Sequence, residues 1–281
     1  MYYICTMENN QVKELIAFIR TLCDEDGKFN EETKGWKDFY DLGIGRDCTN
    51  TIPNQEIIPS CYDSEEDMEK AVNGNSKIDT SRSRQELFFI NQVCKKYSQL
   101  LSDVRLQYLE VGTYHGASAI ATCWENKSVK VWTIDSYESG GTHNYSATPE
   151  DAVNNFMLFN VKDSVTAIIK DSAEILHSDL VINEQRFVVE QGIHVFFYDG
   201  CDDNEEKIRQ TFINLIPLMS DVCICIFDQK TVSERKPNLS CLFKEVLGEK
   251  ITPEQFKEVS FNPPKSYGSS QFHCYLLKKN R

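Results

Sequence analysis

Two glycines four residues apart follow an apolar run, and a carboxylate stands just before them. The segment reads Leu109-Glu110-Val111-Gly112-Thr113-Tyr114-His115-Gly116-Ala117-Ser118. Glycines let the chain turn tightly and let a ligand approach the backbone. Glu110 could accept a hydrogen bond from a cationic ligand amine or from a backbone N–H. Because an acid would repel a pyrophosphate, the spacing E-x-G-x-x-x-G argues against a dinucleotide turn. An ordinary glycine turn is the competing interpretation.

Acidic and hydroxyl residues also end the next two predicted strands. Asp135 and Ser136 follow the second strand, where a carboxylate can accept hydrogen bonds from both hydroxyls of a ribose. A surface acid at a strand end is the alternative. Asp171 and Ser172 follow the third strand, where they could contact an adenine edge, cap the next helix, or do both.

Two more carboxylates end the fourth and fifth predicted strands. Asp199 follows one of them, and Asp228 is followed by Gln229 after the other. The carboxyl ends of neighbouring parallel strands lie at one edge of a sheet. Two carboxylates and an amide oxygen there would suit Mg²⁺. Ordinary strand-end acids are the competing interpretation.

A sheet must bring these residues together, and the sequence from residue 83 onward predicts one. Ser83-x-x-Glu86 is a capping box that opens a helix. Beyond it, apolar runs of strand length alternate with helical stretches expected near 116–126, 149–160, 172–180 and 203–219. The strand candidates are Gln107–Val111, Lys130–Asp135, Ser164–Lys170, His194–Asp199 and Val222–Asp228, then Phe256–Phe261 and Phe272–Lys278. This alternation predicts an α/β fold: a doubly wound, mostly parallel seven-stranded sheet with an antiparallel C-terminal hairpin.

Residues 1–82 form a predicted N-terminal extension before the main domain of residues 83–281. Apolar side chains at helical spacing predict a helix over 8–23. Residues 24–82 are polar and acidic, and we expect them to be irregular, with one short helix near 64–72. Such a segment could be a lid, an arm in a homo-oligomer, or surface decoration.

The charge balance narrows the classes of partner. The chain has 30 Lys and Arg against 43 Asp and Glu, a net charge of −13. An acidic chain is a poor match to DNA, bulk RNA or an anionic membrane surface. Eleven cysteines without a CxxC pair favour reduced thiols in a cytoplasmic setting. The opening MYYICTMENN lacks signal-peptide features, and no apolar stretch is long and unbroken enough to predict a membrane span.

Together these features resemble the class I S-adenosylmethionine-dependent methyltransferases, over about residues 83–281. Glu110-x-Gly112-x-x-x-Gly116 is similar to the family's first motif. The run from Gly112 to Ser118 resembles the small-molecule O-methyltransferases of the catechol and cephalosporin-biosynthesis type. The resemblance implies a cofactor site made of Glu110, Gly112, Thr113, Tyr114, Gly116, Ser118, Asp135, Ser136, Asp171, Ser172 and Asp199. It also implies Asp199, Asp228 and Gln229 as ligands of a possible Mg²⁺.

Two residues depart from that pattern. The catechol-type enzymes carry Lys three residues after the metal-binding Asp, and a sugar- or natural-product-modifying branch carries His; this chain has Asp202 there. Gln229 replaces the usual Asn. Both departures concern deprotonation of the acceptor rather than cofactor binding. Asp202 and His143 are the two candidates for the general base, and His143 lies in the segment 138–147 expected to face the substrate.

The function expected from these features is methyl transfer to a hydroxyl of a small molecule, with sugars among the candidate acceptors. Two alternatives remain. A nicotinamide-dependent Rossmann oxidoreductase shares the sheet and the second-strand acid but lacks the glycine spacing. A non-catalytic binding module that keeps the methyltransferase fold would account for the missing Lys or His at position 202. Nucleic acid is not an expected partner, because no basic stripe with interleaved aromatic residues is visible.

Overall fold

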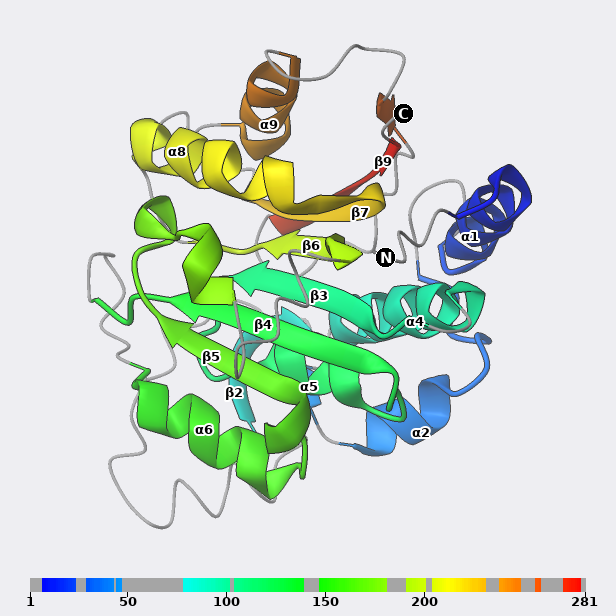
Figure 1. The fold of residues 1–281 in the computed structure, drawn as a ribbon. Coiled ribbons are helices and arrows are strands. Elements are labelled where there is room, and N and C mark those ends of the chain that lie inside the picture. The colour runs from blue at the N-terminus through cyan, green and yellow to red at the C-terminus, as the bar shows by residue number, and fades with distance from the viewer. Residues whose placement is uncertain are drawn as a thin grey trace.

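The protein folds around one seven-stranded sheet, shown in a computed structural model (Figure 1). The structure describes residues 7–23, 29–42, 44–46, 78–101, 104–138, 147–180, 191–200, 204–230, 238–248, 256–258 and 270–278. The strands of this sheet are β3 (Leu106–Val111), β4 (Val129–Asp135), β5 (Val165–Ile169), β6 (Ile193–Tyr198), β7 (Met219–Lys230), β8 (Phe256–Glu258) and β9 (Ser270–Lys278). They lie in the order β5-β4-β3-β6-β7-β9-β8.

The first five of these strands are parallel, and β9 is antiparallel to both β7 and β8. The expected doubly wound sheet with an antiparallel C-terminal pair is therefore confirmed. The strand order reverses between β3 and β6, because the chain adds β4 and β5 on one side of β3 and β6 and β7 on the other. Ligands of open parallel sheets bind outside the carboxyl ends of the strands at such a switch point.

Helices cover both faces of the sheet. One face packs against α1 (Asn9–Thr21), α4 (Arg84–Leu100), α5 (Ala117–Cys123) and α6 (Pro149–Leu158). The other face packs against α8 (Glu205–Leu215) and α9 (Leu239–Gly248) (Figure 1). Because both faces are covered, every residue of β3 and of β6 is buried.

The N-terminal segment contains more regular structure than expected. It forms α2 (Trp36–Asp41) and a parallel pair of short strands, β1 (Ile44–Arg46) and β2 (Ile78–Ser83), so the expectation of an irregular segment is wrong at these places. Aromatic packing accounts for α2: Phe39 and Trp36 contact Phe88 of α4. The helix expected near 64–72 lies outside the described residues. The division at residue 82 remains a prediction.

One other expected element, the helix after the third predicted strand, differs in the structure. The helix expected over 172–180 is replaced by two short 3₁₀ turns, η2 (Ser172–Glu174) and η3 (His177–Leu180). The Asp171 carboxylate accepts a hydrogen bond from the Ala173 N–H, and the Asp179 carboxylate accepts one from the Leu176 N–H. Such side-chain bonds to the backbone favour turns over a continuous helix. Two further 3₁₀ turns are η1 (Lys162–Ser164) and η4 (Ile216–Leu218).

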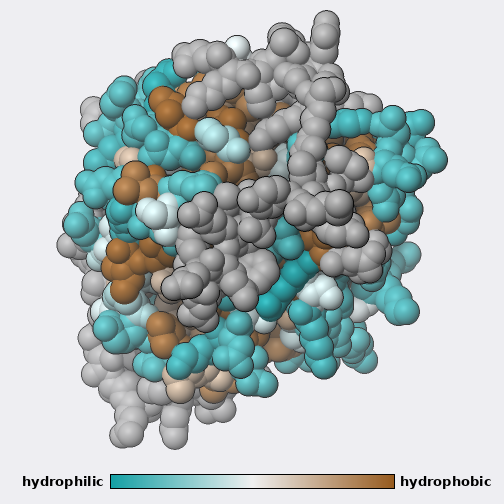
Figure 2. Space-filling model, in the orientation of Figure 1, coloured by the Kyte–Doolittle hydropathy of each residue, from teal (hydrophilic) through white to brown (hydrophobic). Residues whose placement is uncertain are grey.

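On the face shown in Figure 2, hydrophobic residues reach the surface in several groups among hydrophilic ones. Among the residues that the structure describes, the large apolar side chains that are exposed are Met157, Leu158, Ile169 and Leu176. Among the described residues, no helix is long and apolar enough to cross a membrane.

Candidate cofactor site at the sheet switch point

Glu110 lies near the carboxyl end of β3 and is fully enclosed. Its Oε2 accepts hydrogen bonds from the Tyr108 hydroxyl at 2.9 Å and from the Ser118 hydroxyl at 2.7 Å. Its Oε1 is buried and has no hydrogen-bond partner among the described residues. Burial above all, with a smaller contribution from the charges of Asp199 and Asp135, raises the pKa of Glu110 to about 8, although the two hydrogen bonds act in the opposite direction. The site therefore contains one buried carboxyl oxygen, Glu110 Oε1, that makes no hydrogen bond to the described residues.

Gly112 makes the closest backbone approach of the site. Its φ is +93°, and a Cβ added there would lie 2.5 Å from the carbonyl oxygen of Asp199. The Asp199 N–H also donates to the Val111 carbonyl at 2.8 Å. The turn after β3 and the turn after β6 are thus pressed together at the switch point, and only glycine fits between them.

Gly116 is close to a side chain of α6, whereas Gly112 is close to the backbone after β6. It caps α5 in the left-handed conformation, with φ +81°, and a Cβ there would lie 2.4 Å from the Phe156 ring of α6. Asn155, beside Phe156, donates from Nδ2 to the His115 carbonyl at 2.9 Å. The second glycine of the motif is therefore needed for packing against α6.

Asp135 ends β4 and holds the glycine turn. Its Oδ2 accepts from the Thr113 and Tyr114 N–H groups at 2.8 and 2.9 Å, and its Oδ1 accepts from the Tyr137 N–H at 2.9 Å. Tyr114 itself has φ +50° and packs its ring edge-on against His115 at 4.2 Å between centroids. The Asp135 carboxylate, predicted to bind a ribose, thus also fixes the backbone of the glycine turn.

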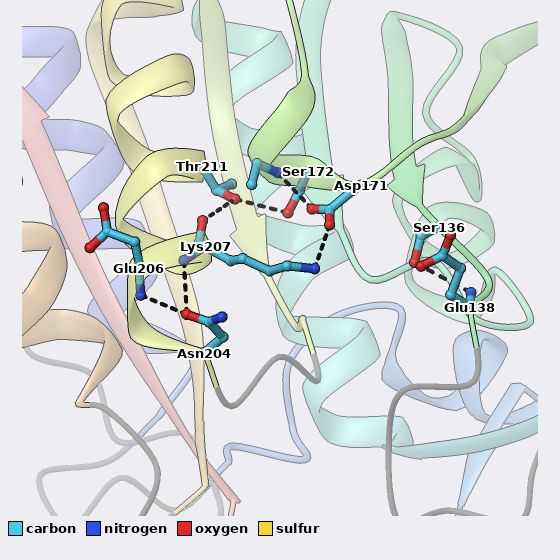
Figure 3. Close-up of polar contacts among 9 residues, drawn as sticks. Ser136, Glu138, Asp171, Ser172, Asn204, Glu206, Lys207 and Thr211 are labelled. Atoms are coloured by element: carbon cyan, nitrogen blue, oxygen red, sulfur yellow. Dashed lines mark hydrogen bonds and ion pairs between the residues drawn. The ribbon is translucent and has the colours of Figure 1, made fainter.

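Two hydroxyl groups are buried beside the turn. The Thr113 Oγ1 and the Tyr137 hydroxyl have no hydrogen-bond partner among the described residues. Burial raises the pKa of the Tyr137 hydroxyl, and the Asp135 charge adds to that shift. Ser136 lies between Asp135 and Tyr137, and its hydroxyl accepts from the Glu138 N–H at 3.3 Å (Figure 3).

Asp171 and Ser172 begin the η2 turn after β5 and are tied to α8 (Figure 3). The Asp171 Oδ1 accepts from the Ala173 N–H at 2.9 Å, and its Oδ2 pairs with Lys207 Nζ at 2.7 Å. Both contacts, that of Lys207 first, lower the pKa of Asp171. The Ser172 hydroxyl lies 2.9 Å from Thr211 Oγ1. The capping role is confirmed for Asp171, at a 3₁₀ turn instead of a helix, and the adenine role of both residues stays a prediction.

Asp199 and Asp228 come from neighbouring strands, since Tyr198 of β6 is aligned with Phe227 of β7. Asp228 is buried and lies inside β7, opposite Phe272 of β9, so this strand is longer than expected. Gln229 also lies in β7, but its side chain is outside the described part. Among the described residues no group of three His, Cys, Asp or Glu side chains could hold a metal ion. The assignment of Asp199, Asp228 and Gln229 as metal ligands stays a prediction.

The two general-base candidates, Asp202 and His143, lie outside the described residues, as does most of the segment 138–147.

Several contact residues of the site were missed from the sequence. Tyr108 stands two residues before Glu110 and so shares its face of β3, a period-2 relation that could have identified it. Lys207, Thr211 and Asn214 share one face of α8, and their helical spacing was a comparable signal. Nothing in the sequence paired that face with η2.

A hollow of ≈ 640 Å³ lies elsewhere, between α1, α2 and the second half of α4. Lys95 in its wall pairs with Glu125 at 2.8 Å. Glu125 follows α5 and precedes β4, so this hollow is at the opposite, amino end of the strands from the glycine turn.

No protein-family model matches the chain, and no curated protein matches it by sequence. Solved structures do match it. The O-methyltransferase NovP has a TM-score of 0.52 at 14% identity, covering 96% of this chain and all of NovP. Rv0187 from MTB, solved with its cofactor bound, has a TM-score of 0.50 at 15% identity, and the match covers 80% of this chain and 100% of the Rv0187 chain. TomG, an O-methyltransferase of tomaymycin synthesis from Streptomyces achromogenes, was solved with SAM. It has a TM-score of 0.50 at 16% identity, and the match covers 70% of this chain and 81% of the TomG chain. The chain therefore has the Rossmann-like methyltransferase fold.

Proposed function

We propose that this protein is an S-adenosylmethionine-dependent methyltransferase that methylates a hydroxyl group of a small molecule. The observation that carries the proposal is the meeting of the Gly112 turn and Asp199 at the switch point, above the buried carboxylate of Glu110. The fold and its likeness to TomG and NovP, both described as O-methyltransferases, support the same activity.

The residues of the switch point suit the parts of this cofactor. Bound S-adenosylmethionine supplies an electrophilic methyl group on a sulfonium centre. Glu110 Oε1 has no partner among the described residues. A cationic amine beside it would favour the ionised carboxylate over the protonated form that the free protein keeps near neutral pH, and would donate to Oε1. Asp135 and Ser136 would lie along the ribose, and Asp171 and Ser172 beside the adenine. Thr113, Tyr114 and Ser118 complete the proposed wall.

What the protein must do is align the acceptor hydroxyl with the methyl carbon and weaken its O–H bond. Asp202 and His143 remain the proposed bases. The proposal contains no metal step. The Mg²⁺ prediction at Asp199, Asp228 and Gln229 is tested separately, by adding a chelator and by replacing Asp228 with Ala. Loss of activity in both cases would support it.

A nicotinamide-dependent oxidoreductase is not favoured. Its pyrophosphate would have to bind at a turn flanked by Glu110, Asp135 and Asp199.

Calorimetry with S-adenosylhomocysteine and with NAD tests the proposal. We expect binding of the first and none of the second. Glu110→Ala should weaken S-adenosylhomocysteine binding by about tenfold or more, because a hydrogen bond to a charged group is lost. Methyl transfer to a panel of hydroxylated molecules, with sugars in one arm and catechols in another, would then identify the acceptor. Binding of NAD alone would contradict the proposal.

A further inference from the structure

Three residues on one face of α8 contact three successive residues around η2. They lie at positions i, i+4 and i+7, which share a helix face. The pairs are Lys207 Nζ with Asp171 Oδ2 at 2.7 Å, Thr211 Oγ1 with Ser172 Oγ at 2.9 Å, and Asn214 Nδ2 with the Ala173 carbonyl at 2.9 Å. Figure 3 shows the first two of these contacts side by side. The turn that begins with Asp171 is thus held at three consecutive points.

The middle contact has a defined direction. The Thr211 Oγ1 lies 2.9 Å from the Lys207 carbonyl oxygen, to which it donates. A carbonyl oxygen accepts only, and a hydroxyl has a single hydrogen to give. The Thr211 hydrogen is therefore used, and in the contact between Thr211 and Ser172 the serine must be the donor. Thr211 is completely buried, so water does not compete for these positions.

This direction sets what Ser172 can offer to a neighbour. With its one hydrogen aimed at Thr211, the Ser172 oxygen has only lone pairs left, so it can accept a hydrogen bond but not donate one. In the adjacent carboxylate, Asp171 Oδ1 accepts from the Ala173 N–H and Oδ2 accepts from Lys207. Ser172 is partly exposed, so its oxygen can meet a ligand.

We propose that Ser172, with its hydroxyl direction set by Thr211, selects a purine with an amino group over one with an oxo group at the same position. The inference rests on the proposed function, which places the adenine of the cofactor beside η2. In that position the 6-amino group donates to Ser172 Oγ. An oxo group would face the serine lone pairs instead. Thr211 is a positioning residue here, because it acts through Ser172.

The test compares S-adenosylhomocysteine with S-inosylhomocysteine, in which oxygen replaces the 6-amino group, by calorimetry. We expect the full-length protein to bind the adenosyl compound about tenfold tighter, the size of effect that one unmade hydrogen bond gives. Thr211→Val keeps the shape but removes the hydroxyl, which leaves Ser172 able to rotate and donate. The preference should then fall to about threefold or less. Thr211→Ser keeps the hydroxyl and should restore the wild-type ratio.

Ser172→Ala should bind both compounds with similar affinity. A wild-type ratio retained in Thr211→Val would overturn the positioning role of Thr211. Equal affinity of the unaltered protein for the two compounds would overturn this inference and leave the cofactor proposal intact. A wild-type ratio retained in Ser172→Ala would also overturn it. Failure of S-adenosylhomocysteine to bind the unaltered protein would overturn the proposed function, and this inference with it.

Discussion

Asp135 accepts three backbone N–H groups with its two oxygens, and this makes it part of the architecture of the site. An ionised carboxylate offers about four acceptor positions. A ribose would therefore have to share Asp135 with the turn that the same carboxylate holds in place. Replacing Asp135 would disturb the backbone at Thr113 and Tyr114 as well as any contact with a ligand, so its effects on binding cannot be assigned to a single contact.

Glu110 should make stability depend on pH. Its pKa in the folded protein is raised from 4.5 to about 8, so between these values the unfolded chain ionises while the folded protein keeps the proton. The free energy of unfolding should therefore fall as pH rises, by about 2 kcal/mol between pH 5.5 and 7.5. Glu110→Gln removes the titration. Urea unfolding of both proteins at the two pH values measures the difference, and parallel pH dependences would contradict it.

Gly112→Ala should destabilise the protein by about 3 kcal/mol or more, because a methyl group would collide with the Asp199 carbonyl in addition to the strain at positive φ. Gly35→Ala is the matched control. Gly35 has φ +87°, but nothing lies within 4 Å of an added Cβ. Gly35→Ala should lower the free energy of unfolding only by the cost of the positive φ, about 1 kcal/mol. Chemical denaturation compares the two, and equal losses would show that the close approach does not matter.

At the scale of elements, two helices begin with a capping box, one of them buried and the other exposed to solvent. Ser83 and Glu86 form a buried capping box at α4, whereas Thr148 and Asp151 form an exposed one at α6. Water can replace a lost cap bond only where it has access. Ser83→Ala should therefore cost about 2 kcal/mol of unfolding free energy, and Thr148→Ala about 0.5 kcal/mol. Thermal and urea unfolding check the order, and a larger loss at Thr148 would contradict it.

The strands could be predicted because their signals are local. The apolar runs that became β6 and β7 are continuous, and the acids at their ends mark one edge of the sheet. The pairing of Lys207 with Asp171 could not be predicted, since it joins two elements far apart in the chain. The same holds for Asp135 and the glycine turn. The sequence placed the candidate residues at one edge, whereas their hydrogen-bond partners depend on tertiary packing.

The whole molecule should respond to cofactor as one cooperative unit. S-adenosylhomocysteine at one hundred times its dissociation constant should add about 2.7 kcal/mol to the stability of the folded state. For a chain of this size that corresponds to a rise in Tm of roughly 5–10 °C. NAD at the same concentration should leave the Tm unchanged. Differential scanning calorimetry measures both, and a rise with NAD alone would favour the oxidoreductase alternative.

The place of β9 between β7 and β8 has a consequence for synthesis of the protein. Although β8 precedes β9 in the chain, it contacts β7 only through β9. While the ribosome is still translating the segment between them, the nascent chain carries β7 with one row of backbone hydrogen-bonding groups unsatisfied. Open strand edges of this kind attract other chains. We expect polypeptides released before β9 is made to aggregate, and chaperones to bind them at β7.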